Sequence, residues 1–255
     1  MSDLHALVSG FSDVAAVYER GRPEYPAAMV ERVVAELGVA PGAPVLDLGA
    51  GTGKLARALL AAGLDVVAVE PLERMRAALA DAIGPGRALE GRAEAIPLPD
   101  ASLDGAVCAE AFHWFDGDRA AAELHRVLRP GGGLVATWLH FQGGDEPWGQ
   151  DVYALLTPLW EAGRHPHLVD GRRGEALERH PGFAPVRRIE MDVEDTIDRD
   201  GLLAWFASFS VVGALPDGER AAFLERLAVV LDRHEAGVTR RAWRAELWVT
   251  RRLGD

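Results

Sequence analysis

The chain has 255 residues, of which 49% are hydrophobic and 26% are charged, and its formal net charge is −12 at pH 7. A chain of this length can bury roughly three quarters of its unfolded surface, so it needs no disulfide or structural metal to fold. The acidic balance disfavours nucleic acid as a ligand, because binding a phosphate backbone draws most of its affinity from clustered Lys and Arg.

The single cysteine, Cys108, leaves no possible internal disulfide. It falls in an apolar stretch, so we expect a small buried hydrophobe rather than a nucleophile. The first residues lack a basic start followed by a long apolar core, and no run approaches the length of a membrane span. We therefore expect a cytoplasmic protein that binds no membrane and that is a monomer or a homodimer.

Helix and strand signals alternate through the first half of the chain. Pro26 and Gly38 bracket an apolar stripe and predict a helix between them. The pattern then predicts strand 45–48, helix 53–62, strand 65–69, helix 72–83, a short strand near residue 88, strand 105–109, helix 119–128 capped by Asp118, and strand 133–138. Strands that alternate with helices imply a parallel sheet covered on both faces.

The alternation loosens after residue 138. We expect a helix over 148–162, a polar linker up to residue 186, a strand to residue 193, helices over 201–208 and 218–234, and a strand over 245–250. The helix over 218–234 is expected to bury one face, formed by Ala221, Leu224, Leu227, Ala228 and Leu231. The large aromatic residues of this half are more typical of a core than of a pocket: Trp148, Trp160, Trp205, Phe206 and Phe209. Arginines near the C-terminus are expected to lie on a solvated surface: Arg240, Arg241, Arg244, Arg251 and Arg252.

The stretch VLDLGAGTGKL, residues 45–55, has the outline of a nucleotide-cofactor site. Gly49, Gly51 and Gly53 allow the backbone to turn tightly beneath a ligand. The dinucleotide fingerprint G-x-G-x-x-G would need glycine where Lys54 stands, and a P-loop would need Ser or Thr in place of Leu55. The alternative without a ligand is a tight turn between strand and helix.

Three further features follow the glycines. Strand 65–69 ends at Glu70, about 20 residues later, where such folds place an acid that accepts both ribose hydroxyl protons. The segments GRAEAIPLPDASLDGAVCAEAFHWF, residues 91–115, and ELHRVLRPGGGLVATW, residues 123–138, come next. Together with D-x-G-x-G-x-G, these segments resemble the class I methyltransferases that bind S-adenosyl-L-methionine. The resemblance is closest to the trans-aconitate methyltransferase-like subgroup, firmly over residues 18–138 and in outline beyond them.

The resemblance implies an α/β, Rossmann-like fold with a seven-stranded, mostly parallel sheet, helices on both faces and a helical lid. One domain is expected. It would comprise an N-terminal lid segment (1–26), a cofactor-binding core (27–138), a helical cap (139–185 and 199–240) and two antiparallel edge strands (186–198 and 241–252).

The resemblance also implies the residues that hold the cofactor. Arg22 would pair with its carboxylate, Ala93 and Glu94 would flank its adenine, and Ala109 and Glu110 would lie beside it at a strand end. Arg92 departs from the family, in which many members carry Asp. The full implied set is Tyr18, Arg22, Asp47, Gly49, Ala50, Gly51, Glu70, Pro71, Ala93, Glu94, Ala109 and Glu110.

Methyl transfer from a sulfonium requires mainly that a nucleophile be held in line and that water be excluded. The implied acceptor is a small molecule with an O, N or C nucleophile. If that nucleophile carries a proton, His113 is the candidate base, and the alternative is a histidine that only holds its loop. Trp114 and His140 are expected beside the substrate. His165, His167 and His180 are expected to be solvated, and no metal site is predicted.

Two other classes of function stay open. An NAD-dependent oxidoreductase is disfavoured by the glycine spacing and by the lack of a Tyr-x-x-x-Lys string. A protein that binds S-adenosylmethionine but catalyses a non-methylating reaction, such as a cyclisation, is poorly distinguished by sequence. The identity of the acceptor is not predicted.

Overall fold

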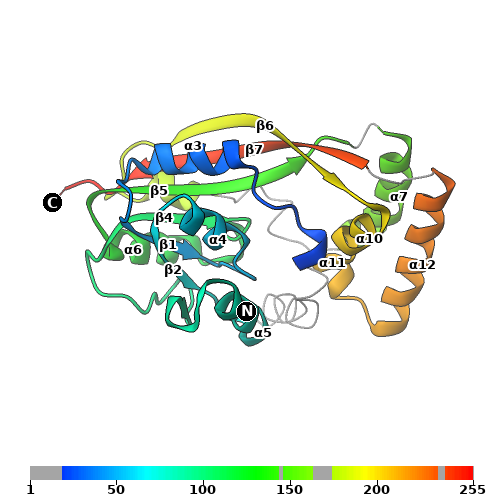
Figure 1. Ribbon diagram of the computed structural model, residues 1–255, viewed down its shortest axis with the longest axis horizontal. Coiled ribbons are helices and arrows are strands. Elements are labelled where there is room, and N and C mark those ends of the chain that lie inside the picture. Colours follow the sequence, from blue (N-terminus) through cyan, green and yellow to red (C-terminus); the bar gives the residue numbers. More distant parts are fainter. Residues whose placement is uncertain (1–18, 144–145, 163–173, 235–238, 255) are drawn as a thin grey trace.

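A computed structural model describes residues 19–143, 146–162, 174–234 and 239–254. Within these residues the chain forms one seven-stranded sheet with the order β3-β2-β1-β4-β5-β7-β6 (Figure 1). The first five strands in this order are parallel, whereas β7 runs antiparallel to both β5 and β6. The strands are β1 Pro44–Leu48, β2 Asp65–Val69, β3 Ala88–Leu89, β4 Leu103–Ala109, β5 Leu128–Phe141, β6 Arg187–Ile197 and β7 Thr239–Arg251. The predicted α/β fold, with two antiparallel strands added at one edge, is confirmed.

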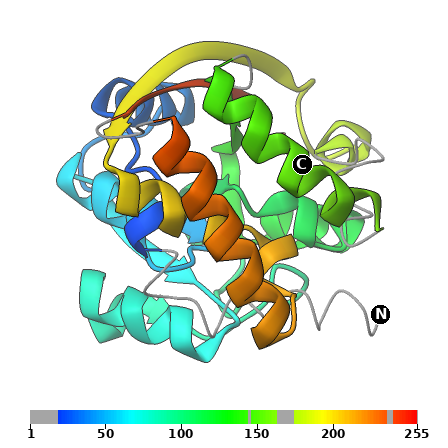
Figure 2. The ribbon, with the colours of Figure 1, turned by 90° about the vertical axis from the view of Figure 1, so that its right-hand side faces the viewer.

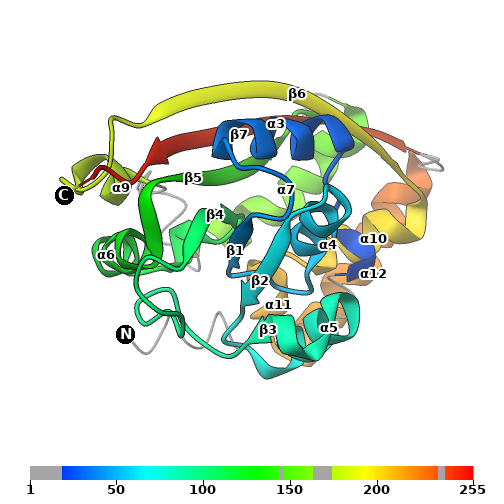
Figure 3. The ribbon, with the colours of Figure 1, turned by 60° about the vertical axis from the view of Figure 1, so that its left-hand side comes forward.

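Helices cover both faces of the sheet. Three helices pack on one face, namely α3 Ala27–Leu37, α4 Lys54–Ala61 and α5 Glu73–Ile83. The opposite face carries α6 Gly117–Val127 and α9 Glu175–Arg179. Figure 3 shows α6 and α9 on one side of the strands and α4 on the other. Short 3₁₀ helices η1 Pro85–Arg87 and η2 Phe112–Trp114 complete this part of the fold.

Four helices from the second half form a cap beyond the carboxyl ends of the strands. They are α7 Pro147–Glu161, α10 Arg199–Ala207, α11 Ser210–Gly213 and α12 Asp217–Arg233. Figure 2 looks onto this cap, with the first described turn of the chain beside α10. Trp148, Trp205 and Phe206 are buried in the same apolar cluster as α3 and α4. The cap therefore continues the core of the domain, and these aromatic residues are core residues, as predicted. No helix among the described residues is long and apolar enough to span a membrane.

Several local predictions need correction. Asp116, rather than Asp118, caps α6, because its carboxylate accepts the Arg119 N–H at 3.3 Å. The buried face of α12 is formed by Phe223, Leu227, Val230 and Leu231, while Ala221 is exposed. Burying Phe223 removes more apolar surface from water than burying an alanine would, so the helix is rotated from the predicted orientation.

The second half holds two further differences. The predicted polar linker contains α9, whose Ala176 and Leu177 are buried in the cluster beneath α6. Strands β6 and β7 extend beyond the bounds that the apolar pattern predicts, because charged residues pair across them where apolar alternation is missing, as Arg240 does with Glu194. Arg241 is buried rather than solvated, with 2% of its surface exposed.

Candidate functional site

The turn between β1 and α4 is built on three glycines with left-handed backbone. Gly49, Gly51 and Gly53 have φ of 74°, 58° and 90°. A Cβ at Gly49 would lie 2.6 Å from the Cβ of Ala111, and one at Gly53 would lie 2.7 Å from Cδ1 of Leu79. Ala111 therefore leaves no room for a side chain at Gly49, whereas at Gly53 the left-handed backbone is the stricter requirement, because the end of the Leu79 side chain could move.

Glu70 follows β2 and lies against this turn. Its Oε2 accepts the N–H of Gly51 at 2.9 Å, and its Oε1 accepts the N–H of Leu72 at 2.9 Å. The side chain is only 5% exposed, and this burial raises its pKa although both N–H groups act in the opposite direction. Each oxygen keeps a second lone pair, so the carboxylate can still accept two hydrogen bonds from a diol.

Asp47 is the most deeply buried acid of the site. It is 1% exposed, and among the described residues its Oδ2 has no hydrogen-bond partner. Burial, joined by the charge of the Glu70 carboxylate, raises the pKa of Asp47 to about 7, although the hydrogen bond from the Ala56 N–H acts in the opposite direction. A buried carboxylate oxygen without a donor is costly, so this position suits a ligand that supplies one, above all a cation.

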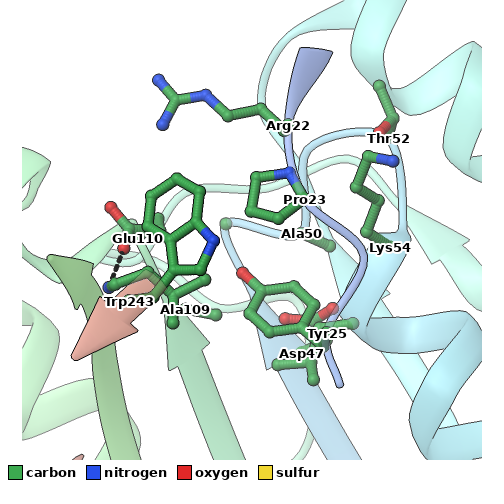
Figure 4. A pocket seen from close by; sticks show the side chains of 13 residues that line it. Arg22, Pro23, Tyr25, Asp47, Ala50, Thr52, Lys54, Ala109, Glu110 and Trp243 are labelled. Carbon is green, nitrogen blue, oxygen red and sulfur yellow. Dashed lines mark hydrogen bonds between the residues drawn. The ribbon is translucent and has the colours of Figure 1, made fainter. Parts of the chain in front are cut away.

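A pocket opens over Asp47 at the carboxyl ends of the parallel strands (Figure 4). Glu110 lies at its edge in the left-handed region, with φ of 53°, which is unfavourable for a residue with a side chain. Its carboxylate accepts the N–H of Leu139 and its own N–H donates to Thr137 O at 2.9 Å. The residues that line the pocket are Arg22, Pro23, Tyr25, Asp47, Gly49, Ala50, Thr52, Lys54, Leu55, Ala109, Glu110, Leu139 and Trp243.

Residues 19–26, which we call the strap, cross over the glycine turn. The Glu19 carboxylate accepts the Thr52 hydroxyl and, at 2.8 Å, the Arg57 guanidinium. Lys54, buried at the start of α4, forms ion pairs with Glu24 and, at 3.6 Å, with Glu19. Burial alone would raise the pKa of Glu19, but the Thr52 hydroxyl and the Lys54 and Arg57 charges outweigh it and lower that pKa. The strap is thus fixed electrostatically to the glycine turn and to α4.

Most of the predicted cofactor residues lie around this pocket. Six of them line it, and Gly51 and Glu70 are joined by their hydrogen bond immediately beside it. Pro71 is exposed directly after Glu70. Ala93 is buried in the loop after β3, and Glu94 accepts the Asp116 N–H at 2.8 Å. Tyr18 lies outside the described residues.

His113, Trp114 and His140 do not line the pocket. The Trp138 indole N–H donates to His113 Nδ1 at 3.0 Å, and an indole nitrogen can only donate. The ring of His113 therefore carries its proton on Nε2 in this arrangement. His140 Nε2 lies 3.2 Å from a carboxylate oxygen of Glu246, and His180 Nδ1 accepts the Gly182 N–H at 3.2 Å. His165 and His167 fall outside the described residues, and no group of three metal-ligating side chains occurs within the described ranges.

The predicted set of cofactor residues omits seven of the pocket residues, namely Thr52, Lys54, Leu55, Leu139, Trp243, Pro23 and Tyr25. The first three lie inside the predicted motif, so their proximity to the glycines was a usable signal. Leu139 directly follows the predicted strand 133–138, and Trp243 continues the alternation of buried residues along β7 ahead of the strand predicted over 245–250.

Comparison with known proteins agrees with this geometry. A family model described as a methyltransferase domain matches residues 46–136. An uncharacterized methyltransferase of Mycobacterium tuberculosis is 36% identical over 230 residues, which cover 89% of this chain and 87% of that protein. A structure from Anaeromyxobacter dehalogenans, assigned to a type II methyltransferase, is 28% identical with a TM-score of 0.60, covering 92% of this chain and 99% of that one. Phosphoethanolamine N-methyltransferase 2 of Haemonchus contortus, in complex with S-adenosyl-L-methionine, shares the fold at 13% identity, with a TM-score of 0.54 over 96% of this chain and 57% of that one.

Proposed function

Because this chain belongs to the S-adenosylmethionine-dependent methyltransferase family, we propose that it transfers the methyl group to an O, N or C nucleophile of a small-molecule acceptor in the pocket under the strap. The subgroup proposed is the trans-aconitate methyltransferase-like one. The position of the strap supports this, since Arg22 and Tyr25, which lie at the start of the region 18–138 where the resemblance is firm, line the pocket.

The observation that carries the proposal is the unpartnered Oδ2 of Asp47 at the base of the pocket. An amino acid ammonium would supply the missing donor and neutralise the buried charge. Glu70 would accept the two ribose hydroxyls, since each of its oxygens has one remaining lone pair. Arg22 would face the carboxylate from the strap, and the loop of Ala93 and Glu94 would flank the adenine. The buried charges and the glycine turn therefore fit this cofactor.

When bound, the cofactor supplies an activated methyl group and a neutral thioether leaving group. The protein then has two tasks, which are to hold the acceptor in line and to exclude water. The strap and the cap would act as the lid that excludes water. Ala109, Glu110 and Leu139 would border the space in which the nucleophile approaches, because they line the pocket beyond Asp47.

Removal of a proton from the acceptor is a separate requirement. Trp138 keeps the Nδ1 of His113 occupied, so His113 would act as a base only if that 3.0 Å contact were broken. In the observed arrangement the ring is a donor through Nε2. We therefore propose that transfer rests on positioning, and the base role of His113 stays a prediction.

Calorimetry with S-adenosylmethionine, S-adenosylhomocysteine and NAD tests the cofactor. Binding of either of the first two, without binding of NAD, is expected. If both fail at millimolar concentration while NAD binds, the proposal is wrong. Incubation with a metabolite pool and methyl-labelled cofactor then tests the reaction, because transfer places the label on an acceptor, whereas a non-methylating reaction leaves it on the cofactor.

A further inference from the structure

Arg241 is a buried charge in the middle of β7. Its side chain is 2% exposed, whereas the neighbouring Arg240 is 70% exposed. The guanidinium binds Asp195 of β6 as a fork, with Nε donating to Oδ1 at 2.8 Å and Nη2 donating to Oδ2. Its central carbon lies 5.0 Å from the ring centroid of Trp205 and 5.1 Å from that of Trp243.

This pair contacts one wall of the pocket through Trp243. The Asp195 Oδ1 that binds Arg241 also accepts the indole N–H of Trp243 at 3.0 Å. Phe141 and Trp205 pack on the same indole, with centroid distances of 5.5 Å and 5.1 Å. The indole is therefore held at its N–H by Asp195 and packed against two other rings. Figure 4 shows it beside Glu110 and Ala109.

The same pair contacts a second wall through the strap. Arg241 Nη1 donates to the carbonyl of Gly21 at 3.3 Å, and the next two residues, Arg22 and Pro23, line the pocket. Gly21 packs directly on the backbone of α10, where an added Cβ would lie 2.3 Å from the carbonyl carbon of Ala204. One guanidinium therefore ties the position of the strap to the position of Trp243.

Stability is a poor explanation for such an arrangement. Removing two charges from water is expensive, and replacing a buried ion pair with apolar residues of similar volume is often neutral or stabilising. The pair instead holds Trp243 and the strap in fixed positions relative to each other, although these two walls of the pocket lie far apart in the sequence. We propose that Arg241 and Asp195 are positioning residues, which hold Trp243 and the strap in the geometry that binds cofactor and acceptor. This inference rests on the proposed methyltransferase function.

The chain offers a matched control for its test. Arg240 and Glu194 form an ion pair in the same two strands, exposed at 70% and 47%, and within the described ranges neither side chain forms a hydrogen bond or ion pair with the strap or with Trp243. The test variant is Arg241→Met combined with Asp195→Leu, which removes both charges together, and the control is Arg240→Met combined with Glu194→Leu. Binding of S-adenosylhomocysteine is measured by calorimetry, and stability by urea unfolding.

We expect the test variant to bind S-adenosylhomocysteine at least about tenfold more weakly, because the strap and Trp243 lose the contacts that hold them, while the protein still unfolds in a single cooperative transition. The control should match the wild type in both measurements. Arg241→Lys provides a second variant, because it keeps the charge but loses the fork that reaches both Asp195 and Gly21. It should fold and bind the same probe more weakly.

Wild-type affinity in both Arg241 variants would overturn the inference, whatever happens to the unfolding midpoint. If the first variant fails to fold, Arg241→Lys alone decides whether Arg241 positions the strap and Trp243 for binding: weaker binding supports this role, and wild-type affinity overturns it. If the wild-type protein itself fails to bind S-adenosylhomocysteine, the proposed function fails instead, so the two failures are distinguishable.

Discussion

Replacing Asp47 with Asn is expected to stabilise the ligand-free protein at alkaline pH and to weaken its binding of cofactor. Burial raises the pKa of Asp47 from 3.8 to about 7, so the folded state holds a proton that the unfolded chain releases. The free energy of unfolding therefore falls as the pH rises from about 4 to about 7, and the loss persists above pH 7. Three pKa units correspond to about 4 kcal/mol. An asparagine carries no charge to desolvate, although its amide must still find partners, so we expect a gain between roughly 1 and 4 kcal/mol.

Urea unfolding at pH 8 and pH 5 measures the gap, which is the difference in free energy of unfolding between Asp47→Asn and the wild type. It should be larger at pH 8, where the buried carboxylate is ionised, and it should shrink at pH 5. The exposed Asp81 on α5 provides the control variant, Asp81→Asn. A gap of equal size at the two pH values, or a less stable Asp47→Asn protein at pH 8, would refute the reasoning from burial.

The same substitution should lower the affinity for S-adenosylhomocysteine, because an amide offers an ammonium no charge. Binding to the wild type near pH 6 should release a proton, since the carboxylate must ionise to pair with the ligand. Calorimetry in buffers of different ionisation enthalpy detects that proton. Its absence in the wild type would show that the ammonium does not meet Asp47.

Three other substitutions test the remaining parts of the site. Glu70→Ala should greatly reduce cofactor affinity without unfolding the protein, while Glu73→Ala, from the exposed first turn of α5, should bind normally in the same titration. Lys54→Gln should speed dissociation of S-adenosylhomocysteine in stopped-flow measurements, because it removes two of the ion pairs that hold the strap to α4; an unchanged rate would count against a role of the strap in ligand exit. His113→Gln should leave the acid limb of the pH profile of kcat/KM in place with an identified acceptor, since the Trp138 contact occupies Nδ1; loss of that limb would restore His113 as the base.

The inner half of the pocket could be predicted from sequence because it is local. Asp47, the glycines and Glu70 lie within two consecutive strand ends, and parallel strands bring those ends to one edge of the sheet. The same locality explains why Pro26 and Gly38 located α3 closely. Motifs of this kind indicate which cofactor binds, because the cofactor is the same molecule throughout a family.

The outer half depends on contacts that no sequence pattern marks. Trp243 has the spacing of an ordinary strand residue, and the antiparallel pairing of β7 with β5 places it opposite Phe141, two residues from Leu139, at the pocket. Arg241 looks like one of several surface arginines, because its partner Asp195 lies 46 residues away. Charge patterning along a chain cannot separate a buried pair from an exposed one when both have the same cross-strand spacing.

We expect the outer wall of the pocket, formed by Leu139, Trp243 and the strap, to determine which acceptor binds. The family model matches residues 46–136, which include Asp47, Glu70 and Glu110 but neither the strap nor Trp243. Proteins that share only that region share most of the residues proposed to hold the cofactor, while Leu139, Trp243 and the strap come from segments that the model does not match. Specificity is a difference between acceptors at those walls. A substitution such as Trp243→Phe should therefore change which acceptors are methylated while leaving the affinity for S-adenosylhomocysteine within a small factor of the wild type, and calorimetry combined with an acceptor screen separates the two effects. Equal losses in both would mean that the indole belongs to the cofactor site and that acceptor choice lies elsewhere in the cap.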